Sequence, residues 1–148
     1  PSINGSSYVL VEFNRNITFW EIKSGLMNIL RLGFIPVVAH VERYQAFEGN
    51  EDYLKEIINM GCYVQINSSS VLKVKWFNDK NKVLKKRAKY FLDRDLVHCI
   101  ASDMHHLSER PSLMKEAFEF ISKKYGRKKA KKLFVDNPKM IITNQMIK

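Results

Sequence analysis

The sequence predicts an α/β domain in which about four parallel strands carry flanking helices. Short apolar runs alternate along the chain with longer segments whose apolar residues recur at helical spacing, and the connections between them are short. The run from Phe34 to His40 is apolar almost without interruption, which is typical of a strand buried on both faces of a parallel sheet. Alternation of this kind favours strands joined by right-handed crossover helices.

The first strand and the first helix are marked by local signals. Tyr8–Phe13 is rich in β-branched and aromatic residues and is bounded by turn-forming residues. Thr18, with Glu21 three positions later, forms a capping-box pattern, and Gly33 predicts the end of the helix that follows. The apolar face predicted for this helix consists of Ile22, Leu26, Ile29, Leu30 and Leu32.

The remaining elements follow by the same reasoning. After the strand at Phe34–His40 we expect, in order, a helix over Asp52–Met60, a strand over Cys62–Asn67, a helical region from about Ser70 to Leu92 with a break near 78–81, a strand over Leu96–Asp103, helices over about Ser112–Tyr125 and Arg127–Phe134, and a short helix that begins at Pro138. No linker, low-complexity segment or repeat divides this series, so we expect a single domain over residues 1–148.

The composition argues against several classes of protein. Hydrophobic residues make up 45% of the chain, which is typical of a globular domain, and no apolar run approaches the roughly 20 residues that span a bilayer. Residues 1–7 lack the features of a signal peptide, and the two cysteines, Cys62 and Cys99, lie in apolar runs without a CxxC pattern. We therefore expect a cytoplasmic protein with no membrane span and with two buried free thiols.

Polar residues with metal-binding side chains stand where the predicted strands end. Glu12, His40 and Asn67 close the first three strands, and Asp103 closes the fourth, followed by His105. The carboxyl ends of parallel strands meet at one edge of a sheet, where the active sites of α/β proteins are built. Carboxylate and imidazole ligands together favour Mn, Fe or Zn, and two such ions can activate a water molecule and polarise a phosphoryl oxygen.

Two arginines lie in the loops beside these residues. Arg43 and Arg110 each follow a strand that carries a candidate ligand. A guanidinium group matches two oxygens of a phosphate group, so the pattern indicates a phosphate-ester site. A salt bridge within the loop, for example with Glu42 or Glu109, is the alternative interpretation of each arginine.

Four segments carry a resemblance to a known family. They are Tyr8-Val-Leu-Val-Glu12-Phe13, Pro36-Val-Val-Ala-His40-Val-Glu-Arg43-Tyr44, Gly61-Cys-Tyr-Val-Gln65-Ile-Asn67 and Ala101-Ser-Asp103-Met-His105-His-Leu-Ser-Glu-Arg110-Pro111. In this order and spacing the chain resembles the bacterial capsular and exopolysaccharide tyrosine phosphatases of the polymerase and histidinol phosphatase (PHP) superfamily.

The resemblance implies the C-terminal portion of a distorted PHP (β/α)7 barrel and a metal-dependent protein-tyrosine phosphatase that acts without a cysteine nucleophile. It implies a centre of two or three Mn²⁺ ions, with Fe, Mg or Zn as alternatives. The implied substrate is the phosphotyrosine tail of a bacterial tyrosine kinase that controls capsule or exopolysaccharide export. The residues it assigns are Glu12, His40, Asp103 and His105 as metal ligands, and Arg43 and Arg110 as catalytic and phosphate-binding residues. Asn67, at the end of the third predicted strand, is a further candidate for substrate binding.

The chain departs from the family pattern in two places. Val41 stands where the family usually has proline, which should change the stiffness of the loop more than its chemistry. The strand with His-x-His that begins the family's barrel has no counterpart here. We therefore expect an incomplete metal cluster, an unpaired edge at Tyr8–Phe13, and weak activity or none in the isolated chain. We expect His98 to lie in the core or against the outer helices, away from the metal.

Three alternatives stay open. A histidinol-phosphatase-like enzyme of the same superfamily would share the chemistry and differ in its leaving group. A nucleic-acid-binding module is motivated by the net charge of +10 and by a basic cluster, although a solvated helix face is favoured because the cluster lacks interleaved aromatic residues. The cluster comprises Lys123, Lys124, Arg127, Lys128, Lys129, Lys131 and Lys132. The third alternative is a non-catalytic remnant that folds by homo-oligomerisation.

Overall fold

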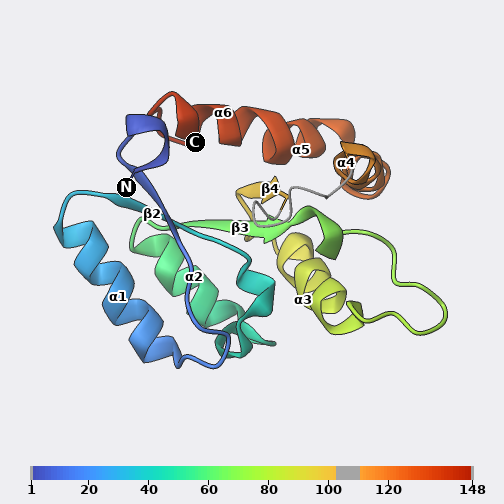
Figure 1. Cartoon of the computed structure of the whole chain (residues 1–148), viewed down its shortest axis with the longest axis horizontal. Helices are drawn as coiled ribbons and strands as arrows, with labels where there is room; N and C mark the ends of the chain where they lie inside the picture. The colour runs from blue at the N-terminus through green and yellow to red at the C-terminus, as the bar shows by residue number, and fades with distance from the viewer. Residues whose placement is uncertain (1, 103–110, 148) are drawn as a thin grey trace.

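A four-stranded parallel sheet forms the centre of the molecule (Figure 1). The computed structural model describes residues 2–102 and 111–147. The strands are β1 (Tyr8–Val11), β2 (Ile35–Val38), β3 (Tyr63–Asn67) and β4 (Cys99–Ala101), and they lie side by side in chain order. Every pairing is parallel. The predicted α/β arrangement is confirmed, with strands shorter than the sequence pattern indicated.

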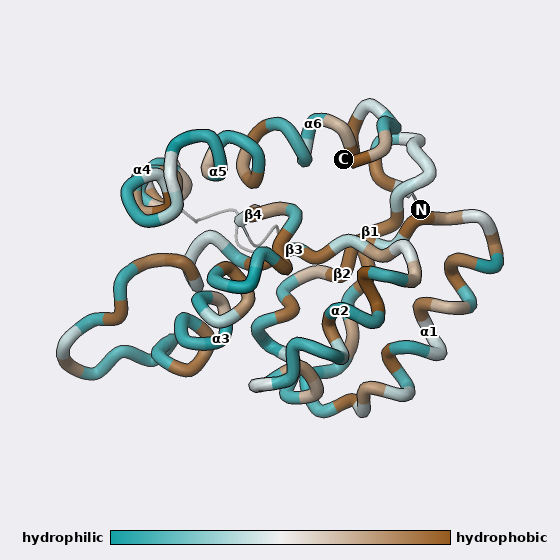
Figure 2. Tube along the Cα trace, turned by 180° about the vertical axis from the view of Figure 1, so that it is seen from behind, coloured by the Kyte–Doolittle hydropathy of each residue, from teal (hydrophilic) through white to brown (hydrophobic). Residues whose placement is uncertain are grey.

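The helices lie on both sides of this sheet. In Figure 1, α1, α2 and α3 lie together below the strands, whereas α5 and α6 run across the opposite side. The helices are α1 (Phe19–Arg31), α2 (Glu51–Asn59), α3 (Lys82–Asp93), α4 (Pro111–Tyr125), α5 (Arg127–Lys131) and α6 (Asn137–Ile142), with a π-helical turn, η5, over Lys132–Asp136. As predicted, Pro138 stands in the first turn of the last helix. β1 and β2 carry mostly hydrophobic residues, whereas α5 is mostly hydrophilic (Figure 2).

The two faces of the sheet contribute to different hydrophobic clusters. Successive side chains of a strand point to opposite faces. One face joins the main core with the first helices, and its buried strand residues are Val11, Val38, Val64, Ile66 and Ile100. The other face joins a much smaller cluster with Ile141 of α6, and its buried strand residues are Tyr8, Val37 and Cys99. We call these the helix face and the hollow face.

Helix α1 shows how local signals position the main core. Thr18 Oγ1 accepts a hydrogen bond from the Glu21 backbone N–H at 3.2 Å, and the Glu21 carboxylate accepts one from the Thr18 N–H at 2.9 Å. This capping box, predicted from the sequence, satisfies donors that a helix start leaves unpaired. Ile22 and Leu26 are fully buried, but Leu32 is 75% exposed, so its assignment to the apolar face is wrong. The helix ends at Arg31, and Leu32 already belongs to the turn before Gly33.

The region between β3 and α3 contradicts a second prediction. The helix expected from about Ser70 to Leu92 forms only from Lys82 onward. Before it, a 3-10 turn over Ser68–Ser70 leads into an irregular loop over residues 71–81. Asp79 accepts hydrogen bonds from the backbone N–H groups of Lys75 and Asn81 at 2.8 and 2.9 Å. Because these N–H groups are bound by a side chain, they are not available to a helix, which is how aspartate favours turns.

The two ends of the described chain lie side by side (Figure 1). The Tyr8 hydroxyl donates a hydrogen bond to the Gln145 carbonyl at 2.7 Å, and Asn144 Oδ1 accepts one from the Ser7 N–H at 2.9 Å. Burial raises the pKa of Tyr8 to about 12, so this hydroxyl stays a donor at neutral pH. No helix within residues 2–102 and 111–147 combines the length and apolar character needed to cross a membrane.

Candidate metal and phosphate site

The ends of β1 and β2 bring two predicted ligands together at one edge of the sheet. The Ala39 N–H donates to the Val11 carbonyl at 3.0 Å, so pairing of the two strands continues to the residues just before Glu12 and His40. His40 Nε2 lies 3.6 Å from Glu12 Oε1. The side chain of His40 is only 7% exposed, whereas that of Glu12 is 46% exposed. The structure thus brings these two predicted site residues together, and their role as metal ligands stays a prediction.

His40 has an unusual backbone conformation. Its φ of 52° and ψ of 46° lie in the left-handed region, which residues with a Cβ atom rarely adopt. The chain turns here directly from β2 into a 3-10 turn over Val41–Arg43. Strain of this kind costs about 1–3 kcal/mol and is concentrated at functional sites. The turn holds the buried imidazole beside the carboxylate of the neighbouring strand.

Glu12 and His40 border a hollow on the hollow face of the sheet. Its volume is about 400 Å³, and its walls are mainly apolar. The residues that line it are Ile3, Leu10, Glu12, Val37, His40, Gln65, Cys99, Ala101, Ser102, Pro138, Ile141 and Ile142. A carboxylate and an imidazole at the border of an apolar hollow match the usual composition of a small-molecule site, in which a few polar groups stand among apolar walls.

The cysteines do not supply a nucleophile to this site. Burial raises the pKa of Cys99, in the wall of the hollow, to about 12, and it does the same for Cys62. Both thiols are therefore protonated at neutral pH, and a thiol is a poor nucleophile compared with its thiolate. Both cysteines are buried and free, as predicted.

A buried carboxylate that sequence reasoning did not assign holds the loop after β2. Glu42 is fully buried, and its Oε1 accepts hydrogen bonds from the Asn67 N–H at 2.9 Å and from the Ser70 hydroxyl at 2.8 Å. Burial raises the pKa of Glu42, while these hydrogen bonds and the charge of Arg43 act in the opposite direction. The sequence shows only a Glu-Arg pair after a strand, so the inward direction of Glu42 could not be read from it.

Arg43 lies between two anchored neighbours. On one side, Glu42 is bound by the Asn67 N–H and the Ser70 hydroxyl. On the other, the hydroxyl of Tyr44 accepts a hydrogen bond from the N–H of Phe13, the residue after Glu12, at 2.9 Å. Arg43 is partly buried and is not among the described residues that line the hollow. Its predicted contact with phosphate stays a prediction.

Asn67 is buried at the end of β3 and is engaged locally. Its Oδ1 accepts hydrogen bonds from the N–H and the hydroxyl of Ser69, both at 2.9 Å. The side-chain carbonyl thus caps the 3-10 turn over Ser68–Ser70. The geometry supports a role in shaping the loop, and the predicted contact of Asn67 with substrate stays untested.

His98 supports the sheet rather than the hollow. The ring nitrogen Nδ1 accepts a hydrogen bond from the Val64 N–H at 3.0 Å, and the backbone N–H of His98 donates to the Val64 carbonyl at 2.9 Å. Burial, together with the charge of Lys132, lowers the pKa of His98 to about 4, so the ring is neutral and can accept. The expectation that His98 lies in the core agrees with these contacts.

Three of the predicted site residues cannot be placed. Asp103, His105 and Arg110 lie outside the residues that the structure describes. Within residues 2–102 and 111–147, no group of three or more His, Cys, Asp or Glu side chains is arranged to hold a metal ion. Glu12 and His40 supply one carboxylate and one imidazole, a donor pair that suits Mn, Fe or Zn as part of a larger ligand set.

Part of the basic cluster is engaged in contacts with neighbouring side chains. Lys129 of α5 forms an ion pair with Asp95, and Lys131 Nζ lies 3.8 Å from Asp136 Oδ1. Lys124 lies 5.8 Å above the ring centroid of Phe120. Lys129 is only 23% exposed, and the interpretation of the cluster as a solvated helix face, rather than as a nucleic-acid-binding surface, stays a prediction.

Comparison with known proteins connects this arrangement to a family. Residues 1–143 match the model of the family described as "Capsular polysaccharide synthesis, CpsB/CapC". The chain is 56% identical over 147 residues to the tyrosine-protein phosphatase CpsB of Streptococcus pneumoniae, covering 99% of this chain and 60% of that protein. It is 33% identical over 145 residues to the putative tyrosine-protein phosphatase CapC of Staphylococcus aureus, covering 98% of this chain and 54% of that protein.

A solved structure confirms the fold. It is described as YwqE from Bacillus subtilis and CpsB from Streptococcus pneumoniae, "unique metal-dependent tyrosine phosphatases". The TM-score is 0.82 at 27% identity, and the match covers 99% of this chain and 57% of the other. The predicted fold class, four parallel strands with flanking helices as in PHP-type proteins, is thereby confirmed. The chain spans about 60% of the length of the first curated relatives it matches.

Proposed function

The chain belongs to the CpsB/CapC family of capsular polysaccharide synthesis proteins, and from this premise we propose that its site serves the metal-dependent hydrolysis of phosphotyrosine. The observation that carries the proposal is the pair of Glu12 and His40, 3.6 Å apart at adjacent strand ends beside the hollow. Relatives named tyrosine-protein phosphatases support the substrate class. Neither buried cysteine offers a thiolate for the alternative route through a phosphocysteine.

In this proposal the chain's residues have separate tasks. Glu12 and His40 hold the metal, and Asp103 and His105 complete the set of donors. When bound, the metal lowers the pKa of a water molecule and polarises a phosphoryl oxygen. Arg43 and Arg110 bind phosphate oxygens through their planar guanidinium groups. Glu42 is a positioning residue, because its hydrogen bonds fix the loop that carries both His40 and Arg43.

We propose Mn²⁺ as the metal, in a centre of two or three ions, and the phosphotyrosine tail of a bacterial tyrosine kinase as the substrate. Support for a metal comes from the description of the solved relative, and the mixture of carboxylate and imidazole donors suits Mn²⁺ as it suits Fe or Zn. The relatives' family description supports a role in capsule or exopolysaccharide control. We further propose that residues 1–148 act as one domain, since each strand pairs with the next along the chain.

The test separates metal binding from turnover. Mn²⁺ affinity is measured by titration calorimetry for the wild type, for His40→Ala and Glu12→Gln, and for Glu51→Gln as a carboxylate control on α2. Loss of one ligand should weaken binding by about 10-fold or more, while Glu51→Gln should bind as the wild type does. Release of phosphate from a phosphotyrosine peptide should be slow, should require Mn²⁺ and should disappear in His40→Ala. Equal Mn²⁺ affinity in all four proteins would overturn the proposal.

A further inference from the structure

The 71–81 loop between β3 and α3 presents two aromatic side chains to solvent. Trp76 is fully exposed, and Phe77 is 82% exposed. The loop projects from the body of the molecule in both overall views (Figures 1 and 2). Folding normally removes large aromatic side chains from water, because each buries about 150–250 Å². Two adjacent aromatic rings outside the core therefore indicate a surface that binds another molecule or a membrane.

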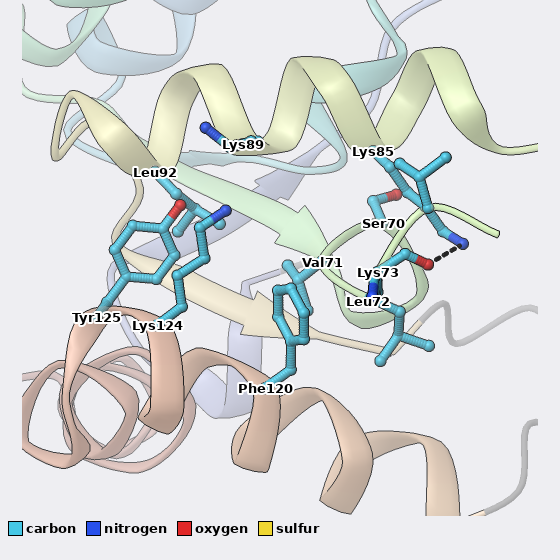
Figure 3. Close-up of a pocket in the computed structure, with 11 residues that line it drawn as sticks. Ser70, Val71, Leu72, Lys73, Lys85, Lys89, Leu92, Phe120, Lys124 and Tyr125 are labelled. Atoms are coloured by element: carbon cyan, nitrogen blue, oxygen red, sulfur yellow. Dashed lines mark hydrogen bonds between the residues drawn. The ribbon is translucent and has the colours of Figure 1, made fainter. Parts of the chain in front are cut away.

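The loop is held in shape by a buried ion pair at its base. Lys85 Nζ lies 2.8 Å from Asp79 Oδ2, and these side chains are only 6% and 4% exposed. The same ammonium group donates to the Lys73 carbonyl at 3.2 Å, the contact drawn as a dashed line in Figure 3. Asp79 also accepts from the backbone N–H groups of Lys75 and Asn81. The hydrogen bonds that Lys85 and the Lys75 N–H donate lower the pKa of Asp79 to about 2, so this carboxylate stays charged at neutral pH.

The base of the loop is also packed against the neighbouring helices. Figure 3 shows Val71 facing Phe120 of α4, with Leu72 beside them. Val71 is buried and belongs to the edge of the main core, whereas Trp76 lies five residues further along the chain and is exposed. Trp76 and Phe77, which we call the tip of the loop, are thus held on a packed base. Their rings are exposed because the fold holds this part of the loop away from the core.

The charge around the tip has one sign. Between Ile57 and Leu92 the only acidic residue is Asp79, and it is neutralised by Lys85. Six other lysines of this region are exposed, namely Lys73, Lys75, Lys80, Lys82, Lys86 and Lys89. The tip therefore combines two solvent-facing rings with a purely cationic surround.

We propose that the tip formed by Trp76 and Phe77 is a docking element for an anionic membrane surface. Trp and Phe side chains prefer the interface between headgroups and acyl chains, with cationic residues beside them. Each lysine close to an anionic leaflet strengthens attachment by about 5-fold. The proposal is independent of the proposed phosphatase activity, because it concerns binding to lipid alone.

The shape of the tip favours a membrane over a protein partner. Ligand sites for peptides and small molecules bury most of the ligand in a concave pocket. Trp76 and Phe77 are instead almost completely exposed, on a loop that projects from the body of the molecule, and the hollow that Trp76 borders is formed with its chain neighbours Lys73, Val74 and Lys75 alone. A lipid interface accepts such a projection without a pre-formed pocket. The uniform positive charge also opposes association of two copies through the same tip.

Binding to vesicles tests the proposal directly. The full chain is sedimented with vesicles of phosphatidylcholine that contain about 30% phosphatidylglycerol, and with vesicles of phosphatidylcholine alone. The wild type should bind the anionic vesicles, and Trp76→Ser with Phe77→Ser should weaken binding by at least about 10-fold, since each ring contributes on the order of a 10-fold gain when buried. Leu32→Ser is the control, because Leu32 is also a largely exposed apolar residue, 75% exposed in the turn after α1, and its loss should not change binding.

Fluorescence identifies the residue that inserts. In the Trp20→Phe variant Trp76 is the only tryptophan, and its emission should shift to shorter wavelength on addition of anionic vesicles. In Trp76→Phe the remaining Trp20 should show no shift. The proposal is overturned if the double serine variant binds as the wild type does, if Trp76 emission does not change, or if light scattering shows a dimer without lipid that the double variant abolishes. Circular dichroism confirms that each variant folds.

Discussion

The two faces of the sheet differ in how completely their side chains are buried. On the helix face, β1 to β4 pack against amphipathic helices, and residues such as Leu26, Leu54 and Ile66 are fully buried. On the hollow face the buried residues that the structure describes form a small cluster around Tyr8 and Ile141, and Leu10 stays 40% exposed beside a space of about 400 Å³. The predicted ligands Glu12 and His40 border that space. Among the described residues, most of the buried core thus lies on one side of the strands and the candidate site on the other, which the alternation of side chains in a strand makes possible.

The largest expected contrast is between equal truncations on the two faces. Ile66→Ala on the helix face should lower the free energy of unfolding by about 2–5 kcal/mol, because it leaves a cavity in close-packed surroundings. Leu10→Ala on the hollow face should cost less than about 1 kcal/mol, since much of that side chain already meets solvent. Urea denaturation measures both. Equal losses would mean that the hollow face is as tightly packed as the core.

A second prediction concerns the carboxylate that links the site to the scaffold. Glu42→Ala should lower the free energy of unfolding by about 2–3 kcal/mol, because the Asn67 N–H and the Ser70 hydroxyl lose their buried acceptor. Glu48→Ala is the control, since the Glu48 side chain is 55% exposed beside its partner Arg87 and its loss should cost less than that of the fully buried Glu42. Chemical denaturation gives the free energy of unfolding of both variants. Equal losses would mean that the buried hydrogen bonds of Glu42 contribute no more than an ordinary ion pair.

The pairing of β3 with β4 should make stability depend on pH through His98. The pKa of His98 is about 4 in the folded chain and 6.5 when unfolded, so the unfolded state takes up the proton first as the pH falls. The stability that the neutral ring provides is complete above pH 6.5 and is lost toward pH 4. Between pH 7 and pH 5 the loss should be on the order of 2 kcal/mol.

The matched variant for this prediction is His98→Asn, whose side-chain oxygen can accept from the Val64 N–H but does not titrate. Unfolding curves of both proteins at pH 7 and pH 5 separate the loss of stability caused by His98 from the loss caused by carboxylates that titrate in the same range. If the two proteins lose stability in parallel, then His98 is not the responsible group.

The smallest expected effect lies at the start of α1, on the helix face. Thr18→Ala removes the acceptor for the Glu21 N–H and should cost about 1 kcal/mol. Thr18→Ser keeps the oxygen and should remain within a few tenths of the wild type. Thermal unfolding followed by circular dichroism compares the two, and a serine variant as unstable as the alanine variant would contradict the capping explanation.

The parts of the fold that burial and capping determine were predictable from the sequence. The apolar run at Phe34–His40 and the Thr18–Glu21 pair correspond to β2 and to the start of α1, because each signal is local or periodic. The helix expected from Ser70 failed because Asp79 binds backbone groups of its own loop, a competition that hydrophobic spacing does not reveal. The pairing of Glu12 with His40 followed from parallel strands, whereas the inward turn of Glu42 depends on donors 25 and 28 residues away.

The contact between Tyr8 and Gln145 has a consequence for the order of folding. Neighbouring strands are separated by only a few tens of residues, so each can add to the sheet as soon as its crossover helix has formed. The Tyr8 hydroxyl, in contrast, waits for a carbonyl 137 positions along the chain. During synthesis on a ribosome β1 therefore emerges before the segment that holds Tyr8, and the Tyr8 hydroxyl cannot bind its acceptor until residue 145 is free. For that interval the ring of Tyr8, which is 1% exposed in the folded chain, lacks the cover of Ile141, and a chaperone that recognises exposed apolar side chains would find a target there.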